Sequence, residues 1–293
     1  VGLGCWQIGW CWGDVSDLDA RELLKKALDN GVNFFDTSDT YGDGRSERFL
    51  SELKNLTKEK IYITTKLGRR VRGTNYKKGY KHEPMEEFID RSLKNLGTDC
   101  IDLLQLHCPP SDICSNKETY EMIDEIVKKG KVANYGVSVW KVSDALEAIK
   151  FKNVKSIQIV FNMFRHKPIE HFLKEAKKKN VAEIARGPLA SGMLTGKITK
   201  NTKFPENDHR NYNKNGEAFD VGDTFSGVNF EKGLIAVEKI KKILPKNFSL
   251  TDLALKWILT HKEVSVVIPG AINKNQVEMN TKASHLDDIH YLM

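Results

Sequence analysis

Four side chains able to move protons lie near the ends of short apolar runs in the first third of the chain. Asp36 follows Val32–Phe35, Lys66 follows Ile61–Thr65 and His107 follows Ile101–Leu106, while Tyr41 lies in the loop after Asp36. Each run is short and rich in β-branched, aromatic or other apolar residues, which is typical of a buried strand. Chemistry at the carboxyl ends of successive parallel strands is how a (β/α)₈ barrel builds its active site.

These four residues suit reversible protonation of a carbonyl or alcohol oxygen. A phenol with a pKa of roughly 10 exchanges protons poorly at neutral pH, but an adjacent ammonium favours the phenolate and lowers that pKa. Lys66 would supply the ammonium, Asp36 would hold it, and Tyr41 would act as the acid or base. His107 would orient the carbonyl oxygen. The alternatives are an ion pair that only seals the barrel and an ordinary core histidine, and the joint occurrence of all four favours the functional interpretation.

The elements between these residues predict the barrel. Apolar residues recur at helical spacing in five segments, which are Ala20–Leu28, Met85–Leu96, Met122–Val127, Ile169–Ala176 and Leu250–Ile258. Further strand-like runs are Val1–Cys5, Val132–Val137, Ser156–Val160, Val181–Ala185 and Val264–Ile268. Eight strands thus alternate with helices. This alternation predicts a parallel sheet, and eight repeats permit closure into an α/β fold of the (β/α)₈ TIM barrel type.

The length favours a single domain over residues 1–293, slightly above the usual size of this barrel. A long loop is expected after the seventh strand, at residues 197–232, which are rich in Asn, Lys, Gly and Asp and carry no helical stripe. A second insertion is expected from Gly68 to His82. The chain begins inside a predicted strand, so an upstream segment is compatible with this sequence.

Lys and Arg number 46 against 39 Asp and Glu, which gives a net charge of +7 at pH 7. Runs such as Lys177–Lys179 lie on the polar face of a predicted helix, so a solvated surface is favoured over nucleic-acid binding. Another basic stretch, made of Arg69, Arg70, Arg72, Lys77, Lys78 and Lys81, lies on the expected active-site side. It would attract an anionic substrate or a cofactor phosphate, with plain solubility as the alternative.

Cysteine and histidine usage predicts neither a disulfide framework nor a metal site. The five cysteines form no C-x-x-C pair, which suggests thiols in a reducing compartment. With no signal peptide and no apolar stretch of membrane-spanning length, the expected localisation is cytoplasmic, without a membrane partner. The remaining histidines of note are expected at the surface without partners: His82, His209, His261, His285 and His290.

Several ordered motifs resemble those of the aldo-keto reductases over nearly the whole chain. They are Gly31–Gly42, Thr65–Lys66, Leu96–His107, Gly130–Val132, Gly136–Ser138, Gln158 with Asn162, Pro188–Lys197 and Ile268–Ala271. The resemblance implies hydride transfer between a nicotinamide cofactor and a small-molecule aldehyde, ketone or sugar, on a barrel without a Rossmann domain. It also implies that Tyr41 is the general acid/base, that Lys66 and Asp36 tune it, and that His107 positions the carbonyl.

The resemblance further implies where cofactor and substrate bind. Ser138 and Gln158 would contact the nicotinamide carboxamide. Pro188, Leu189, Ser191 and Gly192 would lie along the pyrophosphate, and Gly270, Ala271, Gln276 and Asn280 would lie at the adenosine end. Trp6 matches a substrate-pocket position. Trp12 and Trp140 would line the pocket mouth, with ordinary loop packing as an equal alternative.

Three departures from the family pattern bear on the cofactor. Val139 follows Ser138 where many members have Asn, and Arg186 stands where an aromatic residue often stacks on the nicotinamide. A guanidinium can also lie flat on a ring. The basic residues that usually bind the 2′-phosphate are absent between Gly270 and Asn273. Lys274 is the nearest cation to this motif, so NADPH is expected to bind better than NADH by a modest factor.

Two other functions remain open at the level of sequence. The same resemblance extends to potassium-channel β-subunits, which keep the fold and the four residues while turnover is very slow. The chain could therefore be a cofactor-binding regulatory subunit. An isomerase that uses the pocket without a nicotinamide is disfavoured by the matches at Gln158 and Pro188–Gly192.

Overall fold

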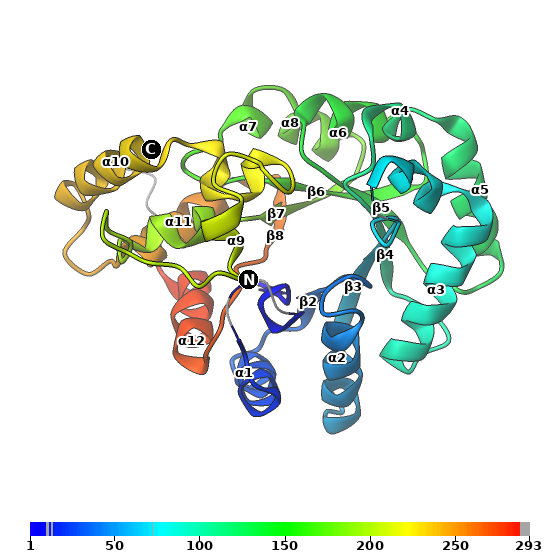
Figure 1. The fold of residues 1–293 in the computed structure, drawn as a ribbon, viewed down its shortest axis with the longest axis horizontal. Helices are drawn as coiled ribbons and strands as arrows, with labels where there is room; N and C mark the ends of the chain where they lie inside the picture. Colours follow the sequence, from blue (N-terminus) through cyan, green and yellow to red (C-terminus); the bar gives the residue numbers. More distant parts are fainter. Residues whose placement is uncertain (10–11, 13, 72, 288–293) are drawn as a thin grey trace.

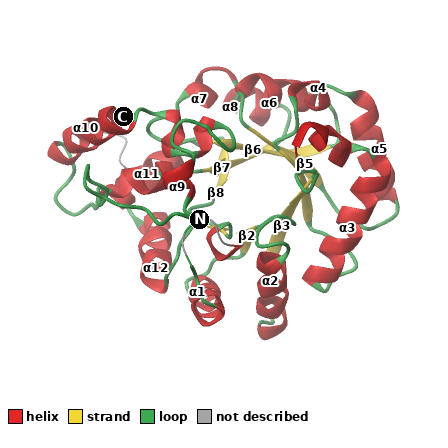
Figure 2. Ribbon diagram, viewed as in Figure 1, coloured by secondary structure: helices red, strands yellow, loops and turns green. Residues whose placement is uncertain are grey.

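Eight parallel strands form the barrel in a computed structural model that describes residues 1–9, 12, 14–71 and 73–287. The strands follow one another in chain order, which confirms the predicted fold class (Figures 1 and 2). They are β1 (Leu3–Gly4), β2 (Phe34–Asp36), β3 (Tyr62–Leu67), β4 (Leu103–His107), β5 (Tyr135–Val139), β6 (Val154–Val160), β7 (Ala182–Arg186) and β8 (Val264–Val267). Gly4 bridges to Gly270, which brings the first strand alongside the chain that leaves the last.

Helices surround the sheet and cover its outer face (Figure 2). They are α1 (Asp17–Asp29), α2 (Arg45–Leu56), α3 (His82–Leu96), α4 (Ser111–Cys114), α5 (Lys117–Lys128), α6 (Val142–Ala148), α7 (Lys167–His171), α8 (Leu173–Lys178), α9 (His209–Tyr212), α10 (Phe230–Lys242), α11 (Leu250–Leu259) and α12 (Lys274–Lys282). α1 shows why such segments form helices. Its N-cap Ser16 accepts a hydrogen bond from the main-chain N–H of Asp19, and Ala20, Leu23, Leu24 and Ala27 bury one face.

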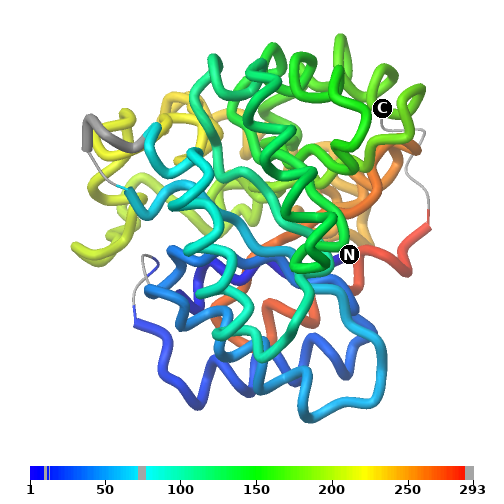
Figure 3. Tube along the Cα trace, turned by 90° about the vertical axis from the view of Figure 1, so that its right-hand side faces the viewer, coloured from blue at the N-terminus to red at the C-terminus, as the bar shows by residue number. Residues whose placement is uncertain are grey.

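The first and last helices pack side by side, so the two ends of the barrel sequence meet. α12 lies next to α1, and the blue and red parts of the trace run together at the bottom of Figure 3. None of the helices in the described ranges is both long enough and apolar enough to cross a membrane. Four cysteines of the described chain, Cys5, Cys100, Cys108 and Cys114, are unpaired, and Cys11 lies outside those ranges.

The elements differ from the sequence expectation in three ways. The fifth strand spans Tyr135–Val139 rather than 132–137, which places Ser138 inside the strand. α2, α4, α6 and α12 were not predicted. The long loop is partly structured, because it contains α9 and two 3₁₀ turns, Val221–Asp223 and Phe225–Gly227, and α10 begins inside the expected loop at Phe230.

Candidate active site

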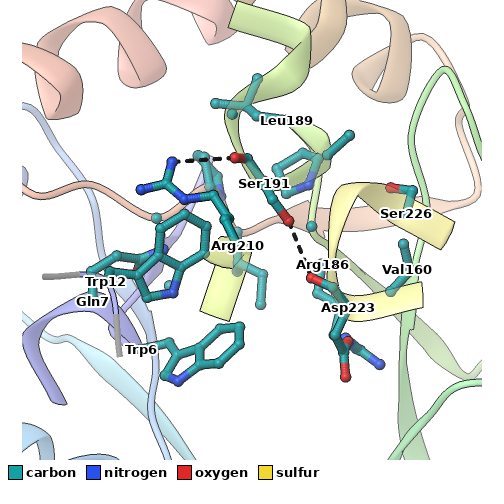
Figure 4. A pocket seen from close by; sticks show the side chains of 18 of the residues that line it. Trp6, Gln7, Trp12, Val160, Arg186, Leu189, Ser191, Arg210, Asp223 and Ser226 are labelled. Carbon is teal, nitrogen blue, oxygen red and sulfur yellow. Dashed lines mark hydrogen bonds and ion pairs between the residues drawn. The ribbon is translucent and has the colours of Figure 1, made fainter. Parts of the chain in front are cut away.

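A cavity of about 1220 Å³ opens at the carboxyl ends of the strands. Drug-sized ligands occupy roughly 300–1,000 Å³, so this cavity has room for a large cofactor together with a small substrate. Tyr41, His107, Gln158 and Arg186 line it from four different strands or the loops that follow them. Figure 4 shows one part of its wall, where Trp6, Trp12, Arg186 and Asp223 converge.

Asp36, Lys66 and Tyr41 form one connected group at the base of this cavity. The Lys66 ammonium donates to Asp36 Oδ2 at 2.6 Å and to the Thr37 carbonyl at 2.8 Å. The same nitrogen lies 3.4 Å from the Tyr41 hydroxyl oxygen. Lys66 is 1% exposed and Asp36 is 4% exposed, so both charges are held away from water. Burial by itself would lower the pKa of Lys66, but Asp36 and Tyr41 raise it, and the ammonium stays charged.

The pKa of the Tyr41 phenol differs from the sequence expectation. Lys66 lowers that pKa, as predicted, but burial of the phenol has the larger effect and raises the pKa to about 12. The expectation of a net lowering is therefore wrong for this structure. A hydroxyl with this pKa is protonated at neutral pH, which suits it to donate a proton.

His107 faces Tyr41 across the cavity, with ring centroids 5.9 Å apart and edge-on geometry. Burial lowers the pKa of this imidazole well below its usual value, and the cations Lys66, Arg69 and Arg186 lower it further. The imidazole is therefore neutral at physiological pH. A neutral imidazole can donate one hydrogen bond and accept another, so it can bind a carbonyl oxygen without being the acid.

Gln158 and Ser138 lie beside this group on neighbouring strands. Gln158 donates through Nε2 to Asp36 Oδ1 at 2.6 Å, and the Ser138 hydroxyl donates to Gln158 Oε1 at 3.2 Å. Each is 1% exposed, and each lines the cavity. Asp36 thus receives hydrogen bonds from both Lys66 and Gln158. One hydrogen-bonded network therefore contains both the residues predicted to bind the nicotinamide carboxamide and those predicted to transfer the proton.

The segment Pro188–Gly192 lines the cavity beyond Arg186. Ala190, Ser191 and Gly192 take left-handed backbone angles, with φ of 47°, 54° and 92°. Such angles are uncommon outside glycine and persist where neighbouring structure enforces them. Here the neighbours are the long loop: Arg210 donates to the Ser191 carbonyl at 3.4 Å and the Ser191 hydroxyl donates to the Asp223 carbonyl at 3.1 Å (Figure 4).

The lining also includes Gly270, Ala271, Gln276 and Asn280, the residues that the family resemblance assigns to the adenosine end. Asn280 donates to the Gly270 carbonyl at 3.2 Å, and Gln276 accepts from the Ile272 main-chain N–H at 2.9 Å. These contacts fix the turn before α12. Lys274 does not line the cavity, and its ammonium lies 3.2 Å from Glu22 on α1.

Asp223 was not predicted as a site residue, and it organises the cavity wall. It pairs with the Arg186 guanidinium and accepts from the Trp140 indole N–H at 2.8 Å. Arg186 also donates to the Val139 carbonyl at 3.2 Å, so its plane is fixed from two sides. A lone Asp within a polar loop offers no sequence signal, because its partners come from distant strand ends.

All three predicted tryptophans line the cavity, and the ring of His209 contacts two of them, Trp6 and Trp12. Trp6 stacks on His209 with ring centroids 4.9 Å apart and lies 5.7 Å from Trp12. His209 is 0% exposed and its Nδ1 contacts the Thr224 hydroxyl at 3.1 Å. The expectation that His209 is a surface residue without a partner is wrong, because the long loop folds back and buries it. His290 lies outside the described residues.

The basic stretch after β3 divides into residues with different surroundings. Arg70 pairs with Asp43 and Lys77 pairs with Asp112, each at 2.8 Å. Arg69 lines the cavity with its guanidinium 4.9 Å from the Trp140 ring, and it forms no ion pair with any described carboxylate. Arg69 is therefore the member of the stretch, among its described residues, that lines the cavity, and Arg72 lies outside the described residues.

The eight-stranded barrel with these residues at its strand ends places the chain in the (β/α)₈ class, and comparisons with known proteins identify the family. The profile of the Aldo/keto reductase family matches residues 1–290. The chain is 30% identical over 285 residues to aldo-keto reductase YhdN of Bacillus subtilis, covering 95% of this chain and 82% of YhdN. It is also 30% identical over 278 residues to a probable voltage-gated potassium channel subunit beta of Oryza sativa subsp. japonica, covering 90% and 81% of the two chains.

A solved structure agrees with this result. The glycerol dehydrogenase AKR11B4 from Gluconobacter oxydans matches with a TM-score of 0.81 and 28% sequence identity, covering 99% of this chain and 88% of that one. The chain belongs to the aldo/keto reductase family. It is accordingly an NAD(P)H-dependent oxidoreductase, as the sequence resemblance implies.

Proposed function

We propose that the protein reduces the carbonyl of an aldehyde, ketone or aldose with NADPH, or catalyses the reverse oxidation, and that Tyr41 transfers the proton. The observation that carries this proposal is the buried Asp36–Lys66–Tyr41 group facing His107 in one cavity. NADPH supplies the hydride when bound. Tyr41 would protonate the substrate oxygen, Lys66 would stabilise the tyrosinate that results, and His107 would hold the oxygen in place.

The cavity residues fit a nicotinamide dinucleotide. Gln158 and Ser138 offer amide and hydroxyl groups for the carboxamide, Ser191 and Gly192 offer main chain for the pyrophosphate, and Asn280 offers an amide for the adenosine end. The choice of NADPH is supported by a relative from Schizosaccharomyces pombe, aldo-keto reductase yakc [NADP(+)], which is 28% identical and covers 96% of this chain. Tyr41, at the substrate side, borders Trp6, with ring centroids 6.2 Å apart.

Replacing Tyr41 by Phe tests the role of its hydroxyl. The expected result is an unchanged affinity for NADPH, measured by fluorescence titration, and a fall in turnover of about 10² to 10⁴, the usual contribution of a positioned acid or base. A panel of aldehydes, ketones and aldoses identifies the substrate for this assay. A variant that keeps most of its turnover would show that another group supplies the proton.

A regulatory role is the second candidate, and the similarity to the potassium channel subunit of Oryza sativa supports it. A regulatory subunit would bind NADPH tightly and reduce no member of a broad carbonyl panel. The titration and the panel together therefore separate the two functions. A tight cofactor complex without turnover favours regulation, while measurable turnover that depends on the Tyr41 hydroxyl favours the enzyme.

A further inference from the structure

Ser38 connects His107 to a buried carboxyl group outside the four proton-transfer residues. Its hydroxyl oxygen lies 3.1 Å from His107 Nδ1 and 3.1 Å from Asp39 Oδ1. Ser38 and Asp39 are both 0% exposed. The same oxygen lies 3.0 Å from the Thr40 hydroxyl and accepts from the Thr40 main-chain N–H at 3.3 Å. Ser38 is therefore the only bridge that the described residues provide between Asp39 and His107.

A serine hydroxyl has one proton, and this limits how the three groups can bond. If Asp39 is ionised, its carboxylate requires the Ser38 proton, and His107 must donate from Nδ1. If Asp39 is protonated, it donates to Ser38, and Ser38 can donate to His107 Nδ1. In either case the Thr40 main-chain N–H and the second donor, His107 or Asp39, occupy both lone pairs of the Ser38 oxygen. The protonation state of Asp39 thus selects the tautomer of the neutral His107 imidazole.

Only one tautomer suits carbonyl binding. Nδ1 is engaged by Ser38, so Nε2 is the ring nitrogen left to face the cavity that His107 lines. A carbonyl oxygen carries lone pairs and no proton. His107 can hydrogen-bond it only when the imidazole proton is on Nε2, which is the arrangement that a protonated Asp39 produces.

The surroundings of Asp39 favour the protonated form. Its Oδ2 is buried and has no hydrogen-bond partner among the described residues. Arg70, which follows β3, and Arg91 of α3 donate to the Asp39 main-chain carbonyl, at 3.1 and 3.3 Å, and not to its carboxyl group. Glu47 of α2 is the nearby acid and is itself bound by Thr65 at 2.6 Å. Burial, followed by the charge of Glu47, raises the pKa of Asp39 to about 7.

We propose that a protonated Asp39 donates to Ser38, and that Ser38 in turn donates to His107 Nδ1 and keeps the imidazole proton on Nε2 for the substrate oxygen. Asp39 and Ser38 are positioning residues, since they act through His107. The proposal deepens the proposed function and rests on it for the role of His107. It makes carbonyl reduction depend on a carboxyl group that never touches the substrate.

The tautomer can be measured directly by long-range ¹H–¹⁵N NMR of the His107 ring, assigned by comparison with His107→Gln. We expect a proton on Nε2 at pH 6 and an increasing population with the proton on Nδ1 at pH 8.5, because Asp39 loses its proton across this interval. This measurement needs no turnover, so it is informative even if the proposed reaction fails. A proton on Nδ1 at pH 6 would overturn the relay.

Asp39→Asn supplies the second test, because an amide N–H can donate to Ser38 at every pH. In the parent protein, kcat/KM for carbonyl reduction should fall above pH 7, approaching tenfold per pH unit. In Asp39→Asn the fall in kcat/KM should begin only at the pH at which the next group titrates. His107 Nε2 should stay protonated at pH 8.5. Asp29→Asn, at an exposed carboxylate that pairs with Lys25, serves as the control and should leave the profile unchanged. The proposal would be contradicted by an Asp39→Asn variant in which kcat/KM still falls above pH 7 and the His107 proton still moves to Nδ1 at pH 8.5, as in the parent protein.

Discussion

Two opposed influences meet at the Tyr41 hydroxyl. Burial raises its pKa and the Lys66 ammonium at 3.4 Å lowers it, and the result is a pKa of about 12. In reduction the phenol begins as a donor and is already in the required state at neutral pH. In oxidation it must first give up its proton. The geometry therefore favours reduction near neutrality and oxidation in alkaline solution.

The Arg69 side chain alone would make the pocket favour anionic substrates. Its guanidinium lines the cavity and forms no ion pair with a described carboxylate. We expect Arg69→Gln to raise KM for succinic semialdehyde about threefold to tenfold while KM for butanal stays unchanged. The reason is that a partly exposed ion pair contributes about 1 kcal/mol, and only the first aldehyde is anionic.

The control for this prediction is Lys78→Gln, a charge loss in the same segment at an exposed residue that does not line the cavity. It should change neither KM. Steady-state kinetics at low and high salt extend the test, since the effect of Arg69 should weaken as salt screens the charges. Equal increases in KM for both aldehydes would mean that Arg69 contributes to the shape of the pocket and not to the selection of anionic substrates.

The four residues proposed for proton transfer could be chosen from the sequence because each lies at or near a strand end, and local pattern is enough to find a strand end. It did not predict Asp223, His209 or the Ser38–Asp39 link. Asp223 and His209 lie in the long loop, and their partners Arg186 and Trp6 are distant in the chain. Such contacts depend on how a loop folds back, which no short-range periodicity records.

Among the elements, the long loop shows how a polar segment can be ordered without an apolar stripe. Asp223 joins the loop to Arg186 at the end of β7 and to Trp140 just after β5. His209, earlier in the same loop, inserts beside Trp6 near the end of β1. The loop is thus attached at three strand ends, and this explains why the expectation of a structureless segment was incomplete.

α2 escaped prediction for a related reason. Its buried face mixes Phe49, Leu50 and Leu53 with the buried polar residues Arg45 and Glu47, so the apolar repeat is interrupted. Arg45 donates to main-chain carbonyls and Glu47 accepts from Thr65 and Asn95, so these polar groups are satisfied by distant partners. The predicted start of the fifth strand, Val132, lies before the observed start at Tyr135. Val132 pairs with Ile101 only in an isolated bridge that precedes the strand.

Glu183 on β7 is a buried acid that no function described above uses. It is 0% exposed, and neither carboxyl oxygen has a hydrogen-bond partner among the described residues. Burial raises its pKa well above the usual value. The folded state therefore binds a proton that the unfolded state releases above its pKa of roughly 4.3, so stability falls as pH rises, by about 1.4 kcal/mol per pH unit until the folded pKa is reached.

We expect Glu183→Met to increase the free energy of unfolding, and to do so more at pH 8 than at pH 5.5. Urea denaturation at the two pH values measures this difference between variant and parent. Glu175→Met is the control, at an exposed acid on α8, and should change stability by no more than about 0.5 kcal/mol at either pH. A Glu183 variant with the same stability gain at both pH values would show that the folded protein binds no extra proton at Glu183, and that burial does not raise the pKa of this acid above the pH range tested.

At the scale of the whole molecule, alternation of strand and helix predicted the barrel, because each repeat makes its own local contribution to the pattern. What local pattern does not give is how the two ends of the chain meet. Gly4 bridges to Gly270, and α1 packs on α12. This contact brings Glu22 to Lys274, the cation expected to favour NADPH over NADH.

The ion pair between Lys274 and Glu22 would determine how strongly the protein prefers NADPH over NADH. The two side chains are 61% and 49% exposed, and pairs of this kind contribute at most about 1 kcal/mol, so a cofactor 2′-phosphate can draw Lys274 away from Glu22. We expect NADPH to bind more tightly than NADH by about tenfold or less, which corresponds to roughly 1.4 kcal/mol. Lys274→Ala should remove most of this preference without changing NADH affinity.

Glu22→Gln should act in the opposite direction, because it releases Lys274 for the phosphate. The expected result is a preference for NADPH increased about twofold to fivefold, within the energy of an exposed ion pair. The double variant Glu22→Gln/Lys274→Ala should bind both cofactors like Lys274→Ala alone, since the effect of Glu22 is transmitted only through Lys274. Fluorescence titrations with both cofactors measure all four proteins. The contrary outcome is that Glu22→Gln raises the preference for NADPH even when Lys274 is replaced by Ala. The Glu22–Lys274 contact would then not determine cofactor choice, and another cation near the adenosine end must be responsible.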